Sequence, residues 1–222
     1  LWPAMLLAFG CNEDELPQNF LINGFLISDG EKMSKSRGNV IDPLTVHENY
    51  NTLLDGRGVE VLRYVLMREF AFGTDGDITP EKIADRYTHQ LVNGLGNTTR
   101  RIVSMTHKYG VTLEKERYQR LADTIRQAHT EKMQVHEFQT AVEYLWNCLE
   151  EIDRGIETVK PWELKKTGDW ETLTKELSKW AVTLEVIAEA LYPIMPESSE
   201  LLRKQLAGEQ IMLFPKIESL EP

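Results

Sequence analysis

Three apolar stripes at helical spacing occupy most of the second half of this 222-residue chain and constrain its fold more than any other feature. A stripe that recurs every three or four residues predicts a helix with one buried face, and such helices are stable only when packed against each other. With two shorter helical segments, 116–130 and 198–206, the pattern predicts an α-helical bundle of about five helices. The stripes are Ile83, Tyr87, Leu91, Leu95, Ile102 and Met105; Phe138, Val142, Leu145, Leu149, Ile152 and Ile156; and Leu173, Leu177, Ala181, Leu184, Ala188 and Leu191.

The first 77 residues have a different character. Residues 19–28, NFLINGFLIS, predict one or two strands that end at the turn dipeptide Asp29-Gly30. One or two strands do not form a stable sheet alone, so this part is interpreted as the rim of a larger α/β domain. We therefore divide the chain into residues 1–77 and residues 78–222.

Between these strands and the bundle, residues 31–39 predict an exposed loop and residues 51–57 a surface loop. Asp42-Pro43 predicts one helix start, and residues 59–70 predict a second, amphipathic helix. At the other end, residues 1–10 are interpreted as the end of a buried helix that Gly10 terminates. Because the chain begins with Leu1 inside this apolar segment, we expect it to be a fragment.

Charge and composition exclude several classes of protein. A net charge of −10 argues against indiscriminate coating of nucleic acid, although residues 100–126 carry seven Lys or Arg against three acids. No apolar run reaches the roughly 18 to 20 residues needed to cross a bilayer. Two distant cysteines, Cys11 and Cys148, give no disulfide framework or CxxC pair and favour a reducing compartment. The five histidines lack ligand-like spacing, so no metal site is predicted.

Two lysines three residues apart suggest phosphate chemistry. Lys32 and Lys35 flank small residues in the string Lys32-Met33-Ser34-Lys35-Ser36, directly after a predicted strand and turn. Ammonium groups on such a loop can close over a triphosphate and offset the charge that develops during displacement. Neither of the Gly-rich phosphate-binding patterns is present. The alternative is an ordinary basic surface loop.

A second candidate site lies in the bundle. Asn97 and Arg101 are four residues apart and share one helix face, while Trp162 follows Pro161 just beyond a predicted helix. Unstacked bases are read by aromatic stacking and by hydrogen bonds at their edges, which this trio can supply. The alternatives are a solvated polar pair and a tryptophan that caps the bundle; Trp146, Trp170 and Trp180 are interpreted as core or cap residues.

The lysine string with Gly38-Asn39 behind it resembles the second signature of class I aminoacyl-tRNA synthetases. The neighbouring segments resemble the order found in methionyl-tRNA synthetases, and the resemblance extends from Leu1 to about Trp162. These segments are Trp2-Pro3-Ala4-Met5-Leu6, Gly24-Phe25-Leu26, Val40-Ile41-Asp42-Pro43, Leu62-Arg63-Tyr64 with Arg68-Glu69, and Phe72-Gly73-Thr74-Asp75-Gly76-Asp77.

The resemblance implies a mainly α chain, in which the end of a Rossmann-type α/β catalytic domain precedes an anticodon-binding helical bundle. It implies an ATP-dependent methionine–tRNA ligase that forms methionyl adenylate and then charges tRNA(Met). Lys35 and Lys32 would be catalytic, and Lys32, Met33, Ser34, Lys35 and Ser36 would bind ATP, which acts with Mg²⁺. Asn97, Arg101 and Trp162 would recognise the anticodon CAU.

The sequence departs from the family in what it lacks. The His-Ile-Gly-His-like first signature, the half with the methionine pocket and the inserted domain that often carries zinc are absent, so this chain is predicted to hold no zinc site. An N-terminal catalytic half is therefore an expected partner, in cis or in trans, and the chain alone should not aminoacylate tRNA. The expected location is the cytoplasm, or alternatively the mitochondrial matrix, without a membrane. Two alternatives are a stand-alone tRNA-binding module without catalysis and a sister class I synthetase for another aliphatic amino acid.

Overall fold

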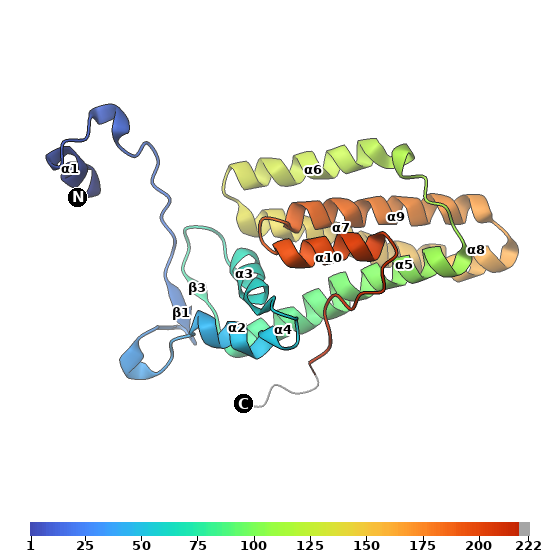
Figure 1. Ribbon diagram of the computed structural model, residues 1–222, viewed down its shortest axis with the longest axis horizontal. Helices are drawn as coiled ribbons and strands as arrows, with labels where there is room; N and C mark the ends of the chain where they lie inside the picture. The colour runs from blue at the N-terminus through green and yellow to red at the C-terminus, as the bar shows by residue number, and fades with distance from the viewer. Residues whose placement is uncertain (218–222) are drawn as a thin grey trace.

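The computed structural model describes residues 1–217 and is mainly α-helical, with one small sheet (Figure 1). The three strands are β1 (Leu26–Ser28), β2 (Glu31–Lys32) and β3 (Gly76–Asp77). The α-helices are α1 (Trp2–Ala8), α2 (Pro43–Asn51), α3 (Gly58–Glu69), α4 (Pro80–Arg86), α5 (Asn97–Tyr109), α6 (Gln119–Gln134), α7 (Phe138–Val159), α8 (Pro161–Thr167), α9 (Trp170–Leu191) and α10 (Pro196–Leu206).

The first predicted stripe forms one continuous helix from Pro80 to Tyr109. It begins where the Thr79 hydroxyl accepts a hydrogen bond from the Lys82 amide at 3.3 Å, and Gly110 ends it with φ +64°. The middle of this helix, η3 (Tyr87–Gly96), is π-helical and joins α4 to α5. Local π-helical geometry is rare and often marks functional positions. The sequence pattern predicted the helix but not this change of winding.

The bundle contains the predicted helices and one more. α5, α6, α7, α9 and α10 run side by side in Figure 1, and their apolar stripes form a buried core. Trp146 and Trp180 are buried in this core, as predicted, and so is Cys148, while Trp170 is the first residue of α9 and is half exposed. The additional helix is the short α8, which was not predicted from the sequence.

The strand order in the sheet is β2-β1-β3. β1 and β2 form an antiparallel hairpin with Ile27 opposite Lys32, and β1 runs parallel to β3 with Leu26 opposite Gly76. A Cβ on Gly24 would lie 1.9 Å from the Thr74 carbonyl oxygen, so only glycine allows this close approach before β1. Only the last three residues of the predicted strand segment 19–28 are in a strand.

The prediction of a buried helix at the start of the chain is wrong. α1 forms and Gly10 follows it with φ +91°, but α1 has no buried residue and stands apart from the rest of the molecule in Figure 1. The physical reason is that no described residue covers it. Large exposed apolar side chains in this region are Leu1, Trp2, Met5, Leu7, Phe9, Phe20, Leu21, Ile22 and Phe25.

The surface loop predicted for residues 51–57 is also wrong in part. Leu54 and Arg57 are buried, because the turn after α2 packs against residues from the C-terminal part of the chain. One hydrophobic cluster extends from Val46 to Phe214, across the boundary placed after Asp77, and the division into two domains stays a prediction. Within residues 1–217, no helix combines the length and apolar character required to cross a membrane.

Candidate functional site

The lysine loop, residues 32–39, extends from the β1–β2 hairpin and contains a short 3-10 turn, η2 (Lys35–Arg37). Asn39 closes the loop from both sides. Its Oδ1 accepts a hydrogen bond from the Ser34 amide at 2.9 Å, and its Nδ2 donates to the Lys32 carbonyl at 3.4 Å. This role of Asn39 was not predicted, although Asn directly after Gly38 is a residue type that commonly hydrogen-bonds to nearby backbone in turns.

The two lysines of the loop are exposed and have no carboxylate partner within residues 1–217. The acid nearest in sequence, Glu31, pairs instead with Arg37. Lys32 Nζ lies 5.6 Å from the centre of the Phe25 ring, and Met33 packs against the hydrophobic core, which anchors the loop at its base. Both ammonium groups are therefore available to an anion that approaches the loop.

The loop lies at an edge where α/β proteins commonly bind ligands. The hairpin leaves β1 at its carboxyl end, beside the carboxyl end of the parallel strand β3. Ligands of open α/β sheets bind in the crevice outside the carboxyl ends of parallel strands. The predicted residues 32–36 are therefore brought together at such an edge.

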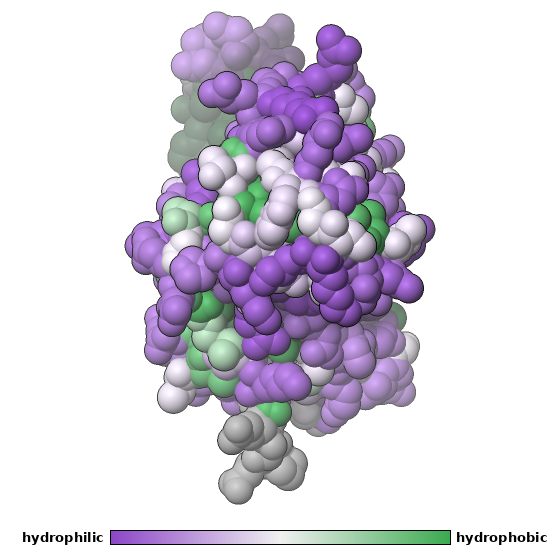
Figure 2. All heavy atoms as spheres, turned by 90° about the vertical axis from the view of Figure 1, so that its right-hand side faces the viewer, coloured by the Kyte–Doolittle hydropathy of each residue, from purple (hydrophilic) through white to green (hydrophobic). Residues whose placement is uncertain are grey.

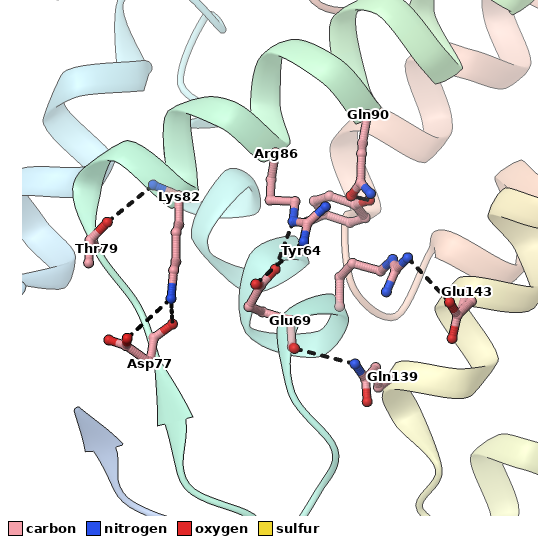
Figure 3. Close-up of polar contacts among 10 residues, drawn as sticks. Tyr64, Glu69, Asp77, Thr79, Lys82, Arg86, Gln90, Gln139 and Glu143 are labelled. Carbon is pink, nitrogen blue, oxygen red and sulfur yellow. Dashed lines mark hydrogen bonds and ion pairs between the residues drawn. The ribbon is translucent and has the colours of Figure 1, made fainter. Parts of the chain in front are cut away.

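Polar side chains connect this sheet to the bundle (Figure 3). Lys82 of α4 reaches back to β3, where its Nζ donates to the Asp77 carbonyl at 2.9 Å and lies 3.3 Å from Asp77 Oδ2. One turn further along, Arg86 Nε donates to Glu69 Oε2 of α3 at 2.7 Å. Gln139 of α7 donates to the Glu69 carbonyl at 3.3 Å. The start of the long helix is thus fixed to β3 and to α3, and α3 is in turn joined to α7.

The second candidate site lies farther along the same helix. Arg101 extends toward α7, where its Nη2 lies 2.8 Å from Glu157 Oε1 and its Nη1 lies 3.5 Å from Asp153 Oδ1. Asn97 Oδ1 accepts a hydrogen bond from Arg100 Nη2 at 3.1 Å. The predicted polar pair is on one helix, but two acids that the sequence analysis did not identify hold its guanidinium.

The two acids differ in their surroundings. Burial raises the pKa of Asp153, while the Thr98 hydroxyl, which donates to it at 2.8 Å, and the Arg101 charge act in the opposite direction. Glu157 is exposed. The Arg101 pairing is therefore partly buried on the Asp153 side and open to solvent on the Glu157 side, where another hydrogen-bond acceptor can reach the guanidinium.

Trp162 lies in the first turn of α8. This turn is at the same end of the bundle as the ion pair between Arg101 and Glu157. Lys160 has φ +50° and precedes Pro161, which redirects the chain after α7. The Trp162 residue is 37% exposed. Lys165 Nζ lies 4.8 Å from the centre of the Tyr109 ring, so α8 also contacts the end of α5. Glu157 of the Arg101 pair is in the last turn of α7, directly before this corner.

The two candidate sites are at opposite ends of the molecule in Figure 1, with the lysine loop near the sheet and α8 at the far end of the bundle. Figure 2 looks onto the α8 end, whose surface is mostly hydrophilic with a pale band across its middle. Within residues 1–217, no group of three or more His, Cys, Asp or Glu side chains is arranged to hold a metal ion. The lysine loop and the bundle end are thus separate sites joined by one helix.

Comparison with known proteins identifies the family of the chain. A family model described as tRNA synthetases class I (M) matches residues 1–103. A methionine–tRNA ligase of Fusobacterium nucleatum is 32% identical over 100% of this chain and 35% of its own length. A methionine–tRNA ligase of Bacillus subtilis is 33% identical over 92% of this chain and 31% of its own length.

The solved structures include methionyl-tRNA synthetase of Mycobacterium tuberculosis in complex with methionyl-adenylate. It matches with a TM-score of 0.73 and 28% identity, over 97% of this chain and 47% of that one. The chain spans about a third of the length of the curated relatives it matches. These similarities cover both the sheet with its lysine loop and the bundle, and they show that the chain belongs to the methionyl-tRNA synthetase family of class I tRNA synthetases.

Proposed function

We propose that this chain is part of an ATP-dependent methionine–tRNA ligase. The observation that carries the proposal is the lysine loop, whose two ammonium groups have no carboxylate partner among the described residues and lie at the carboxyl ends of β1 and β3. In the proposed first step a methionine carboxylate oxygen attacks the α-phosphorus of ATP. The bond from that phosphorus to the bridging oxygen breaks, and pyrophosphate leaves as methionyl adenylate forms.

Lys35 is proposed to stabilise the charge that builds on the leaving pyrophosphate, with Lys32 assisting. Positioned cations act most strongly where charge develops, so their contribution appears in the rate more than in ATP affinity. The backbone at Met33-Ser34 and the Ser36 hydroxyl would border the nucleotide. Mg²⁺ is proposed to enter with ATP, bound to the phosphates of the substrate.

The remaining wall of the ATP site is proposed to come from an N-terminal class I half, in cis or in trans. The exposed apolar side chains of residues 1–25, including Phe20 and Ile22, support this assignment. Exposed apolar patches of this kind mark surfaces that another part covers. The cytoplasm is the proposed compartment.

The bundle end is proposed to bind the anticodon of tRNA(Met). Arg101 and Asn97 would hydrogen-bond to base edges, and the partly exposed Trp162 ring would stack on an unpaired base. Arg101 would exchange its contact with Glu157 for a base, because that side of the ion pair is exposed. In the second proposed step the methionyl group moves from the adenylate to the terminal adenosine of the bound tRNA.

The proposal is tested by methionine-dependent exchange between labelled pyrophosphate and ATP. The chain is assayed with an N-terminal half of a relative that contains the first signature, either fused to it or added in trans. Exchange that requires both parts and methionine, and that leucine, isoleucine or valine does not support, is expected. A well-folded pair that lacks exchange contradicts the catalytic assignment, and exchange with another aliphatic amino acid contradicts methionine as the substrate.

A further inference from the structure

The lysine loop, residues 32–39, is largely exposed, and few contacts hold its shape. Among the described residues, Asn39 is the one side chain that hydrogen-bonds to the loop backbone. A second contact across the loop joins Arg37 to Glu31, and both of these side chains are more than half exposed. Exposed ion pairs contribute little to stability, because solvent screens the charges and two long side chains must be ordered. The shape of the loop therefore depends mainly on its backbone and on Asn39.

The Asn39 amide bridges the backbone at the two positions that carry the lysines. Its Nδ2 donates to the carbonyl of Lys32 at 3.4 Å, and its Oδ1 accepts at 2.9 Å from the amide of Ser34, the residue directly before Lys35. The oxygen and the nitrogen of an asparagine side chain belong to one planar amide, so the bridge sets the separation of these two backbone groups. One side chain therefore constrains the backbone beside both ammonium groups.

Ser34 transmits this constraint to Lys35. Its amide donates to Asn39, and its carbonyl accepts a hydrogen bond from the Arg37 amide at 3.1 Å. Ser34 is extended, with φ −149° and ψ 145°, and the 3-10 turn η2 starts at the next residue. Gly38, at φ +69°, then returns the chain to Asn39 in a left-handed conformation that glycine adopts readily. The turn and the bridge together fix the backbone of Lys35, while its side chain stays exposed.

A fixed backbone matters for a lysine because its ammonium group sits on a flexible four-carbon chain. A cation stabilises a transition state most when it is already in place before charge develops. Without the bridge, Lys32 and Lys35 would still be present, but their ammonium groups would be spread over more positions. The expected consequence is a slower reaction with little change in the affinity for ATP.

We propose that Asn39 is a positioning residue for the formation of methionyl adenylate. It contacts neither the substrate nor the reacting atoms. It acts through the backbone of Lys32 and Ser34, which holds the ammonium groups of Lys32 and Lys35 where the leaving pyrophosphate develops its charge. The inference rests on the proposed function of the lysine loop and assigns to Asn39 a part in the rate of that step.

The test measures methionine-dependent exchange between labelled pyrophosphate and ATP by the complete two-part enzyme. Asn39→Ala should lower the rate constant roughly 10-fold, the value of one to two net hydrogen bonds, with little change in the KM for ATP. Its melting temperature should equal that of wild type, because the loop is exposed. Arg37→Gln is the matched control: it removes the other contact across the loop and should change the rate constant little.

A double variant distinguishes positioning from a general structural role. Asn39→Ala combined with Lys35→Gln should be at most about 3-fold slower than Lys35→Gln alone, because the ammonium group through which Asn39 mainly acts is then missing. A structural contribution that is independent of Lys35 would lower the rate by the same factor in both backgrounds. Hydrogen–deuterium exchange of the Ser34 amide tests the contact itself, and it should be faster in Asn39→Ala than in wild type.

The outcomes separate this inference from the proposed function. If wild type catalyses no pyrophosphate exchange, or if Lys35→Gln is as fast as wild type, the assignment of the loop to ATP is contradicted and this inference with it. Suppose instead that Lys35→Gln is slow. If Asn39→Ala then matches wild type in rate or in exchange of the Ser34 amide, or if its full loss persists beside Lys35→Gln, Asn39 is not a positioning residue and the ligase function stands.

Discussion

The first 25 residues and the helical bundle differ in the exposure of their apolar side chains. The bundle encloses its stripes, and Leu145 and Leu177 are fully buried between helices. In the N-terminal region Phe9, Phe20 and Ile22 are instead mostly exposed. Burial of apolar surface is the main driving force of folding, so the bundle is stabilised by its own contacts. The N-terminal region carries the surface that a larger catalytic domain would cover.

The largest expected effect concerns this contrast in stability. Leu145→Ala should lower the free energy of unfolding by about 2 to 5 kcal/mol, because it leaves a cavity at a fully buried position of α7. Phe20→Ala removes a larger side chain but should change the stability of the chain by less than about 0.5 kcal/mol. Urea denaturation of both variants measures the difference. Equal losses would show that residues 1–25 are packed as the bundle is.

A substitution of Arg57 tests the contact between the turn after α2 and the C-terminal segment around Ser198 and Leu213. It is 4% exposed and donates to three acceptors: the Leu54 carbonyl at 3.0 Å, Ser198 Oγ at 2.7 Å and the Leu213 carbonyl at 3.0 Å. Arg57→Met leaves these acceptors without their donor and should cost about 3 kcal/mol of unfolding free energy.

Arg63→Met is the matched control for this prediction. Arg63 is exposed, and within residues 1–217 its guanidinium makes one hydrogen bond, to the Pro193 carbonyl. Its loss should cost less than about 1 kcal/mol. If both variants lose the same stability, the buried contacts of Arg57 do not hold the C-terminal segment in place.

Trp162 should matter for RNA binding and little for stability. Trp162→Ala is expected to weaken binding of the CAU stem-loop by about 1 to 3 kcal/mol, the value of stacking one base on an aromatic ring. Trp170→Ala, at an exposed position on the neighbouring helix, should bind as wild type does. Fluorescence titration measures both. If Trp170→Ala loses more affinity than Trp162→Ala, the ring that stacks on the base is Trp170 of α9 and not Trp162.

The smallest expected effect is a pH dependence inside the bundle. His129 on α6 is 7% exposed, and burial lowers its pKa from the usual 6.5. The unfolded chain therefore takes up this proton at a higher pH than the folded chain, and His129 makes stability fall as pH drops below about 6.5.

The measurement is the melting temperature of wild type and His129→Gln between pH 7.5 and pH 5. As the pH falls, the melting temperature of wild type should drop more than that of His129→Gln. His107→Gln, at an exposed position, is the control. Its melting temperature should differ from that of wild type by the same amount at every pH. A gap for His129→Gln that stays constant with pH would show that the buried imidazole is not the titrating group.

The long helices were predictable because each carries a stripe of several turns, whereas features made by distant residues were not. Arg57 was assigned to a surface loop because its partners lie 141 and 156 residues away in the sequence. α8 has seven residues, too few for a period to show. The π-helical winding of residues 87–96 was not predicted, because apolar side chains three or four residues apart predict an α-helix.

In the candidate sites too, residues adjacent in sequence were predictable and contacts between distant residues were not. The residues of the lysine loop were predictable because they are adjacent in sequence, and the structure brings them to one sheet edge. The acids that hold Arg101 are more than 50 residues away from it, and only packing of α5 against α7 reveals them. The roles assigned to Lys35, Lys32, Asn97, Arg101 and Trp162 stay predictions.

The most direct test of the central claim compares two cations of the same loop in methionine-dependent pyrophosphate exchange by the complete two-part enzyme. Lys35→Gln should lower the exchange rate constant roughly 100-fold, a loss of about 3 kcal/mol of transition-state stabilisation, with little change in the KM for ATP. Arg37→Gln should have little effect, because Arg37 is already paired with Glu31. Equal rates for Lys35→Gln and wild type, in a folded enzyme, would contradict the assignment of this loop to ATP.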